Sequence, residues 1–275
     1  MIDFAPTRAS RAREPIFSIP PIVVVVVGAL LAIHAALTFF GASAQDIAYR
    51  DFAFLPGRLT VALWPDSLGE ALARVNDSPA ALEQGLLIRH FGILNGGSKL
   101  WTLITYAGLH GSWTHVGVNC VWLVAFGPPI ARRFGAVRFL LFFATTAIAG
   151  ALAHWASTPM DFAPLIGASA ADSGLMAAAA RFIFQPGAPL GAPGGYSARL
   201  SGAEADAPAA TLIELLTQRR ALVFIVIWMA SNFVFGAGAQ SLGASEAPVA
   251  WVAHVGGFVA GLLLFPLFDR RGRAV

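Results

Sequence analysis

The sequence predicts an all-α, polytopic membrane protein with a bundle of six transmembrane helices. Of its 275 residues, 57% are hydrophobic and only 12% are charged, and the mean hydropathy is +0.68. A soluble domain has about 25% charged residues, so this chain has too little polar surface to cover a soluble globule. Long apolar stretches approach the ~20 residues that a helix needs to cross a bilayer, which favours helices over a barrel of short alternating strands.

Six stretches are apolar enough to be predicted as membrane spans. The first is rich in valine, and the fourth is short and rich in alanine. A further apolar piece at 100–109 is too short to span and is predicted to be interfacial or re-entrant. The six stretches are residues 22–40, 113–130, 139–155, 169–184, 221–239 and 248–268.

The basic residues predict how these spans are oriented. Arginines occur in the N-terminal tail 1–21, between spans two and three, in or beside the Gly/Pro-rich linker 185–220, and in the C-terminal tail 269–275, whereas the opposite short loops have none. Positive charge favours the cytoplasmic side, so both termini and the linker are predicted to be cytoplasmic. The membrane domain is then 22–268, and its long first loop, 41–112, lies on the other side and includes a helix-like piece at 67–75.

Two further features concern the environment of the chain. The first span could be a cleaved signal peptide, but its apolar run of ~19 residues exceeds the ~7–15 of such a peptide, which favours an uncleaved anchor. Arginine greatly outnumbers lysine, and alanine and glycine are abundant, which fits the inner membrane of a GC-rich bacterium.

Composition excludes several other classes of function. The net charge is only +3 and the arginines are dispersed, so no nucleic-acid partner is predicted. The single cysteine, Cys120, excludes an internal disulfide framework and a cysteine-rich metal site. We therefore expect no metal and no cofactor, with the lipid bilayer as surroundings. Nothing in the sequence specifies an oligomeric state.

Polar side chains on three predicted spans lie at one depth. Counting ~1.5 Å per residue from the first cytoplasmic charge puts Ser169, Asn119 and His254 about 18–22 Å up, in the outer half of a ~30 Å core. His115 lies one helical turn from Asn119 on the same face. A serine becomes a nucleophile when an imidazole takes its proton, and amide and imidazole N–H groups stabilise an oxyanion. The combination favours nucleophilic catalysis.

Three glycines are expected to shape this region. Gly167 lets another group approach the backbone just before the serine. Gly257 and Gly261 form a small-xxx-small pair, which would let span six pack tightly on span four.

The polar residues also have structural interpretations. A lone helical serine usually bonds the carbonyl four residues earlier, and a lone buried histidine is more often structural than catalytic. Asp172 is expected first as a capping residue of the helix that starts near Ser169, ahead of a role in a catalytic triad. Asn232 is expected to form an interhelical hydrogen bond, and His154 to be an interfacial residue.

From roughly residue 54 to residue 264, the chain resembles the rhomboid intramembrane serine proteases. Four blocks carry the resemblance: 110–119 is similar to the family's H-x-x-x-N region, 126–135 to the loop that follows, 167–176 to its G-x-S-G block and 253–258, with Gly261, to its A-H-x-G-G-F block. The resemblance implies Ser169 as nucleophile, His254 as general base and acid, and His115 and Asn119 as oxyanion-hole donors. It also implies substrates that are single-span membrane proteins, cut near the outer end of their helix.

Three positions depart from the family pattern, and an alternative function is also considered. Ala170 stands in place of the family's glycine after the nucleophile, Ala131 where a glutamate is frequent, and Ser173 where an aromatic ring often packs on the histidine. The alternative is a non-proteolytic rhomboid-like protein that binds or dislocates membrane clients, although such proteins usually lack the serine or the histidine. A transporter is disfavoured because no internal repeat is found and Asp172 is the only acid inside the spans.

Overall fold

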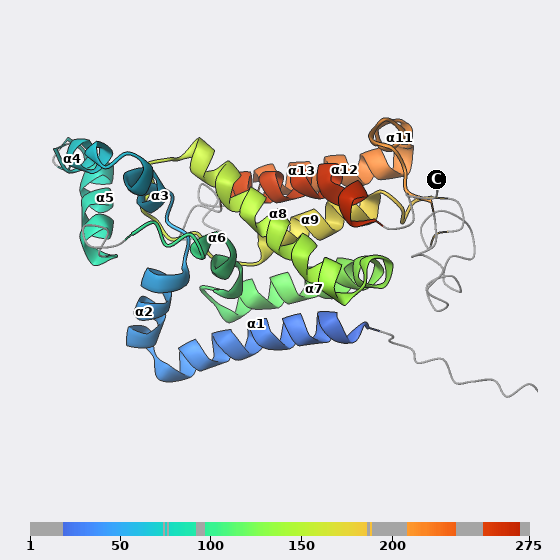
Figure 1. The fold of residues 1–275 in the computed structure, drawn as a ribbon, viewed down its shortest axis with the longest axis horizontal. Helices are drawn as coiled ribbons and strands as arrows, with labels where there is room; N and C mark the ends of the chain where they lie inside the picture. Colours follow the sequence, from blue (N-terminus) through green and yellow to red (C-terminus); the bar gives the residue numbers. More distant parts are fainter. Residues whose placement is uncertain are drawn as a thin grey trace, which may run out of the picture.

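The described part of the chain is mostly helical. The computed structural model describes residues 19–73, 75, 77–91, 97–185, 188, 208–234 and 250–269. In these ranges β-type pairing is confined to one isolated bridge between Phe54 and Leu165. Long helices lie alongside one another, and a group of short helices lies at one end (Figure 1). The all-α prediction is confirmed for this part of the chain.

Four helices are long and apolar enough to cross a membrane. Gly135, with a φ of +78°, lets the chain reverse between the second and third of them, a conformation that glycine adopts without steric cost. Each helix coincides with a predicted span to within a few residues at each end. The four are α1 (Pro21–Phe40), α7 (Trp113–Phe134), α8 (Ala136–Ser157) and α13 (Trp251–Phe268).

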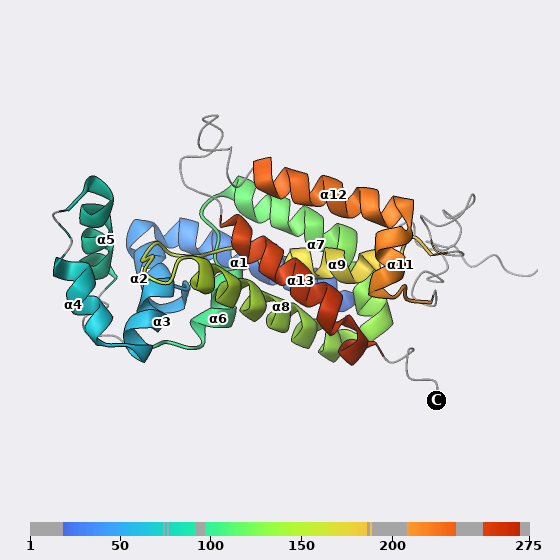
Figure 2. The same ribbon diagram turned by 90° about the horizontal axis from the view of Figure 1, so that it is seen from above.

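One predicted span is shorter in the structure, and another is described only in part. Helix α9 (Ser169–Ala180) has 12 residues, of which all but the first are buried, and its length of about 18 Å is less than the ~30 Å of a hydrocarbon core. It packs against α7, α8 and α13, in the interior of the bundle (Figures 1 and 2). Helix α12 (Arg219–Phe233) covers most of the fifth predicted span, whose remainder reaches beyond the described residues. The six-span count therefore stays a prediction.

The long first loop contains several short helices. The helix-like piece predicted at 67–75 corresponds to α4, and the apolar piece at 100–109 forms α6 and a 3-10 turn. The elements are α2 (Ala42–Phe52), α3 (Pro56–Leu63), α4 (Asp66–Ala73), α5 (Pro79–His90), α6 (Thr102–Thr105) and η2 (Tyr106–Gly108).

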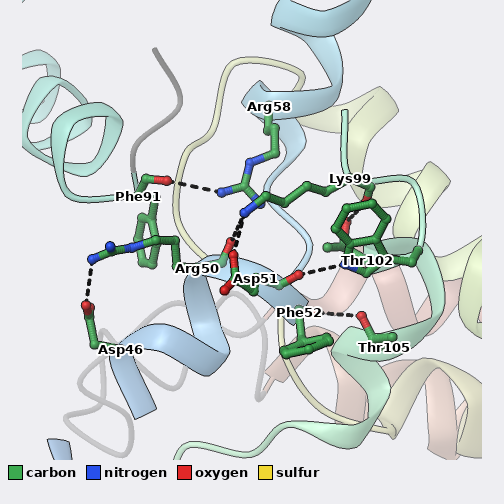
Figure 3. Close-up of polar contacts among 10 residues, drawn as sticks. Asp46, Arg50, Asp51, Phe52, Arg58, Phe91, Lys99, Thr102 and Thr105 are labelled. Carbon is green, nitrogen blue, oxygen red and sulfur yellow. Dashed lines mark hydrogen bonds and ion pairs between the residues drawn. The ribbon is translucent and has the colours of Figure 1, made fainter. Parts of the chain in front are cut away.

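Polar contacts tie the beginning of this loop to its end. Lys99 Nζ donates to Oδ1 of Asp51 at 2.6 Å, and Thr105 Oγ1 donates to the carbonyl of Phe52 at 2.8 Å (Figure 3). Both contacts join α2 to the segment around α6. The described part of the first loop is thus a folded unit that rests on the end of the bundle.

The predicted linker 185–220 is described only at 185, 188 and 208–220. Its last part contains α11 (Leu212–Thr217), which starts with a capping box formed by Thr211 and Glu214, and the first residues of α12. A reciprocal cap of this kind satisfies two backbone donors. The predicted tails, apart from residues 19–21 and 269, lie outside the described residues.

Glycines bring α13 into close contact with α9. A methyl group on Gly257 would overlap the carbonyl oxygen of Ala170, and one on Gly261 would overlap that of Gly174. The backbones approach this closely because neither position carries a side chain. The spacing of this pair thus matches the register in which α13 meets α9.

We expect Gly261→Ala to lower the thermal stability of the detergent-solubilised protein, because the added methyl meets a backbone oxygen that cannot easily move. Overpacking of this kind costs about 1–3 kcal/mol. Gly117→Ala on α7 is the matched control, since a methyl there has no neighbour within 4 Å and alanine is the better helix former. Thermal unfolding should place the midpoint of Gly261→Ala below the wild type and that of Gly117→Ala at or above it; equal midpoints would contradict the packing.

Candidate active site

The candidate nucleophile begins α9, and backbone hydrogen bonds hold the chain that leads to it. The N–H of Gly167 donates to the carbonyl of Tyr106 at 3.0 Å, and the N–H of Ala168 donates to Nε2 of His110 at 3.4 Å. Non-helical backbone at membrane depth requires such partners. Ser169, which is half-buried, therefore stands at the end of a fixed segment rather than on a free loop.

The two candidate oxyanion donors lie beside this segment. Gly167 has a φ of +110°, and a methyl on it would lie 2.6 Å from Nε2 of His115 and 3.5 Å from Nδ2 of Asn119. The side chains come from successive turns of α7, which begins at its N-cap Ser112. The structure thus brings both side chains to the backbone two residues before Ser169.

Asn119 is buried with an unused donor. Its side chain is 2% exposed, and its Nδ2 has no hydrogen-bond partner among the described residues. A buried donor without an acceptor costs about 1–3 kcal/mol. Asn119 Nδ2 is therefore available to donate a hydrogen bond to an oxygen atom of a molecule that binds beside it.

The candidate base, His254 on α13, has a partner on another helix. Its Nδ1 lies 2.7 Å from Oδ1 of Asn232 on α12. The sequence predicts an interhelical hydrogen bond for Asn232 but does not identify its partner, because spacing along the chain says nothing about contacts between helices. A polar side chain at membrane depth was the available signal. His115 and His154 are the titratable groups that act electrostatically on His254.

Helix α8 brings the backbones next to the nucleophile and the base together. A methyl on Gly150 would lie 2.5 Å from Cβ of Ala170 and 2.7 Å from the carbonyl oxygen of Ala253. These alanines directly follow Ser169 and directly precede His254. Both residues of the candidate pair are described, and no hydrogen bond joins the Ser169 hydroxyl to His254. Such bonds are often long in an enzyme without substrate.

The departures from the family pattern have specific surroundings. The methyl of Ala170 faces Gly150 of α8, so the neighbouring helix provides the space that the extra carbon needs. Ser173 Oγ donates to the carbonyl of Ser169 at 2.7 Å, the usual bond of a helical serine. Ala131 is buried near the end of α7.

The capping role expected for Asp172 is wrong. The N-cap of α9 is Ala168, without a side-chain cap, and within the described residues neither carboxylate oxygen of Asp172 has a hydrogen-bond partner. The side chain is 2% exposed and interacts electrostatically with Cys120 of α7. It makes no hydrogen bond to His254, so the described residues contain no Ser-His-Asp triad.

A metal site was not expected. Among the residues that the structure describes, no group of three or more His, Cys, Asp or Glu side chains is placed to hold a metal ion.

We expect His110 to make the stability of the fold depend on pH. Burial, with smaller effects of His115 and His34, lowers the pKa of His110 to about 4, whereas the unfolded chain has a histidine pKa of about 6.5. The stability that neutral His110 contributes is therefore fully present above pH ~6.5 and is lost as the pH falls towards 4. The unfolding temperature of the wild type should fall more steeply between pH 7 and pH 4.5 than that of His110→Gln. Parallel curves for the two proteins would contradict the assignment.

Comparisons with known proteins match this chain to one family. A family model described as the rhomboid domain matches residues 97–271. The rhomboid protease GlpG of Serratia proteamaculans (strain 568) is 28% identical over 176 residues, which are 64% of this chain and 50% of that protein. YdcA of Bacillus subtilis (strain 168), named as a candidate rhomboid protease, is 36% identical over 86 residues, 31% of this chain and 42% of that protein.

The extent of these matches decides what they establish. The matches span half or less of the length of the two curated relatives, so the activity of those whole proteins is not transferred by them. The family model covers more than half of the chain, and four helices are apolar enough to cross a membrane. This chain is therefore an integral membrane protein that belongs to the rhomboid family.

Proposed function

We propose that this chain is an intramembrane serine endopeptidase. It cleaves single-span membrane proteins near the outer end of their transmembrane helix. The observation that carries the proposal is the convergence of His115 Nε2 and the unpartnered Asn119 Nδ2 on Gly167, two residues before Ser169. Donors that meet at the N-terminus of a helix form a site for negative charge.

The proposed reaction follows from these positions. The Ser169 hydroxyl attacks the scissile carbonyl while His254 takes its proton. The oxyanion that forms accepts hydrogen bonds from His115, Asn119 and the backbone N–H of Ser169. His254 then gives the proton to the leaving amine, which leaves an acyl-enzyme that water hydrolyses with His254 again as the base.

The membrane topology belongs to the same proposal. Helices α9 and α12 complete six spans, and both termini lie on the cytoplasmic side of a bacterial inner membrane. Charged groups that gather at one end of the bundle support this orientation: Arg133 Nη2 lies 2.7 Å from Oδ2 of Asp269, and Arg181 Nη2 donates to the carbonyl of Ala210 at 2.8 Å. Water reaches Ser169 from the opposite, outer side.

A second candidate function rests on one observation. Because no hydrogen bond joins the hydroxyl of Ser169 to His254 in this structure, the alternative is a rhomboid-like protein that binds or dislocates membrane clients without cutting them. The presence of both a serine and a histidine, carried by backbones that meet at Gly150, favours the protease.

Fluorophosphonate labelling of the membrane-embedded protein tests the proposal. We expect the wild type to be labelled, Ser169→Ala not to be labelled, and His254→Ala to react at least about 100-fold more slowly, as for loss of a general base. Asn119→Ala should slow cleavage of a single-span model substrate by about 100-fold or more, as for loss of an oxyanion donor.

Two controls complete this experiment. Ser157→Ala removes an exposed serine at the end of α8 and should leave labelling unchanged. Labelling that persists in Ser169→Ala would overturn the assignment of the nucleophile. An unlabelled wild type that still binds membrane clients would establish the non-proteolytic alternative instead.

A further inference from the structure

Asn232 makes two hydrogen bonds, and together they fix the orientation of its side-chain amide. Nδ2 donates to the carbonyl of Trp228, one turn earlier on α12, at 2.9 Å. Oδ1 lies 2.7 Å from Nδ1 of His254 on α13. Rotating the amide by 180° would place Oδ1 against the Trp228 carbonyl, where two acceptors repel. The amide oxygen is therefore the atom that faces the histidine.

The contact determines which nitrogen of His254 carries the proton. An amide oxygen only accepts, so Nδ1 must donate to it. In a neutral imidazole with the proton on Nδ1, the free lone pair is on Nε2. Nε2 is then the atom that is available to take a proton from a neighbouring hydroxyl.

A second contact holds the two helices in this register. The rings of Trp228 and Phe258 stack with centroids 4.1 Å apart and planes 17° apart. Trp228 precedes Asn232 by four residues on α12, and Phe258 follows His254 by four on α13. The ring stack and the hydrogen bond therefore lie on adjacent turns of two antiparallel helices, and each fixes the level of the other.

We propose that Asn232 is a positioning residue for the catalytic base. It holds the His254 ring in the tautomer and orientation in which Nε2 faces the site. This inference rests on the proposed function, because it assigns the third member of an arrangement in which a nucleophile is activated by a base that another group orients. Asn232 itself touches neither substrate nor reacting atoms.

The surroundings of His254 offer no acidic alternative for this role among the described residues. The titratable groups that act on it are two other histidines, His115 of α7 and His154 of α8. Helix α9 contributes Asp172, whose electrostatic contact is with Cys120. The orienting partner of the base is thus a neutral amide rather than a carboxylate.

The first test uses the fluorophosphonate probe with saturation kinetics on the 275-residue chain in detergent. Asn232→Leu preserves the size of the side chain and removes both hydrogen bonds. We expect it to lower the maximal labelling rate by up to about 100-fold, the cost of a misplaced catalytic group, with half-saturation within about twofold of the wild type. Asn232→Asp keeps an oxygen towards Nδ1 but loses the donor to the Trp228 carbonyl, and it should recover part of the lost rate.

Ser231→Ala is the matched control. Ser231 Oγ donates to the carbonyl of Trp228 at 2.8 Å, the same acceptor that Asn232 uses, but it makes no hydrogen bond to His254. We expect its labelling rate to equal that of the wild type. Equal rates for Asn232→Leu and Ser231→Ala would overturn the positioning role.

The second test reads the tautomer directly and does not depend on activity. Nitrogen-15 spectra of histidine-labelled protein, with the His254 signals assigned by His254→Gln, should show a protonated Nδ1 in the wild type and in Ser231→Ala. In Asn232→Leu the proton should redistribute to Nε2. An unchanged tautomer there would overturn the inference, whereas a wild type without Ser169-dependent labelling would overturn the proposed function itself.

Discussion

The close approach of three helix backbones, α8, α9 and α13, is the constraint on which the rest of this structure depends. In lipid, helices gain little from burying apolar side chains against one another, so tight van der Waals packing carries their association. Here that packing is direct: Gly257 and Gly261 of α13 meet backbone oxygens of α9, and Gly256 meets the backbone of α8 near Gly150. Larger residues at these positions would separate the helices that carry the candidate nucleophile and base.

A buried ion pair fixes the C-terminal end of α13. Arg133 at the end of α7 donates through Nε and Nη2 to Asp269, at 3.1 and 2.7 Å, and its guanidinium lies over the rings of Phe182 and Phe265. A buried ion pair adds little net stability but penalises any arrangement that separates its partners. It therefore sets the register of α13 against α7. With its glycine face on α9 and its end on α7, α13 holds His254 at a defined level relative to the donors on α7.

The sequence predicted most of the helices and few of the contacts between them. Hydropathy is a property of each segment, so α1, α7, α8 and α13 could be located from composition alone. The shortness of α9 could not, because its surroundings bury an alanine-rich helix and because the apolar residues 182–184, which follow Arg181, extended the predicted span. The first loop likewise gave weak local signals, and its fold depends on contacts between distant residues such as Lys99 and Asp51.

In the candidate site, too, the sequence identified several residues but few of their contacts. Asn119 was selected by depth, His115 by helical periodicity and Gly167 as a point of close approach, and the structure brings these three residues together. Asp172 was misjudged because Ser-x-x-Asp is a capping pattern only where the serine precedes the helix, whereas Ser169 is already its first residue and Ala168 is the N-cap. Asn232 was recognised as polar and interhelical, but a hydrogen-bond partner 22 residues away is a property of the fold.

Asn119 and Asn232 differ in how many of their side-chain polar atoms are hydrogen-bonded, and the proposed site accounts for the difference. Both the nitrogen and the oxygen of the Asn232 amide have partners, which suits a side chain that must hold one orientation throughout a reaction. Asn119 Nδ2 has none among the described residues, and a permanent acceptor there would make the fold more stable. Under the proposed function its acceptor is an oxyanion that exists only near the transition state, and only interactions gained at that point raise the rate of the chemical step. The unsatisfied donor is thus a local cost that the glycine packing of α8, α9 and α13 offsets elsewhere.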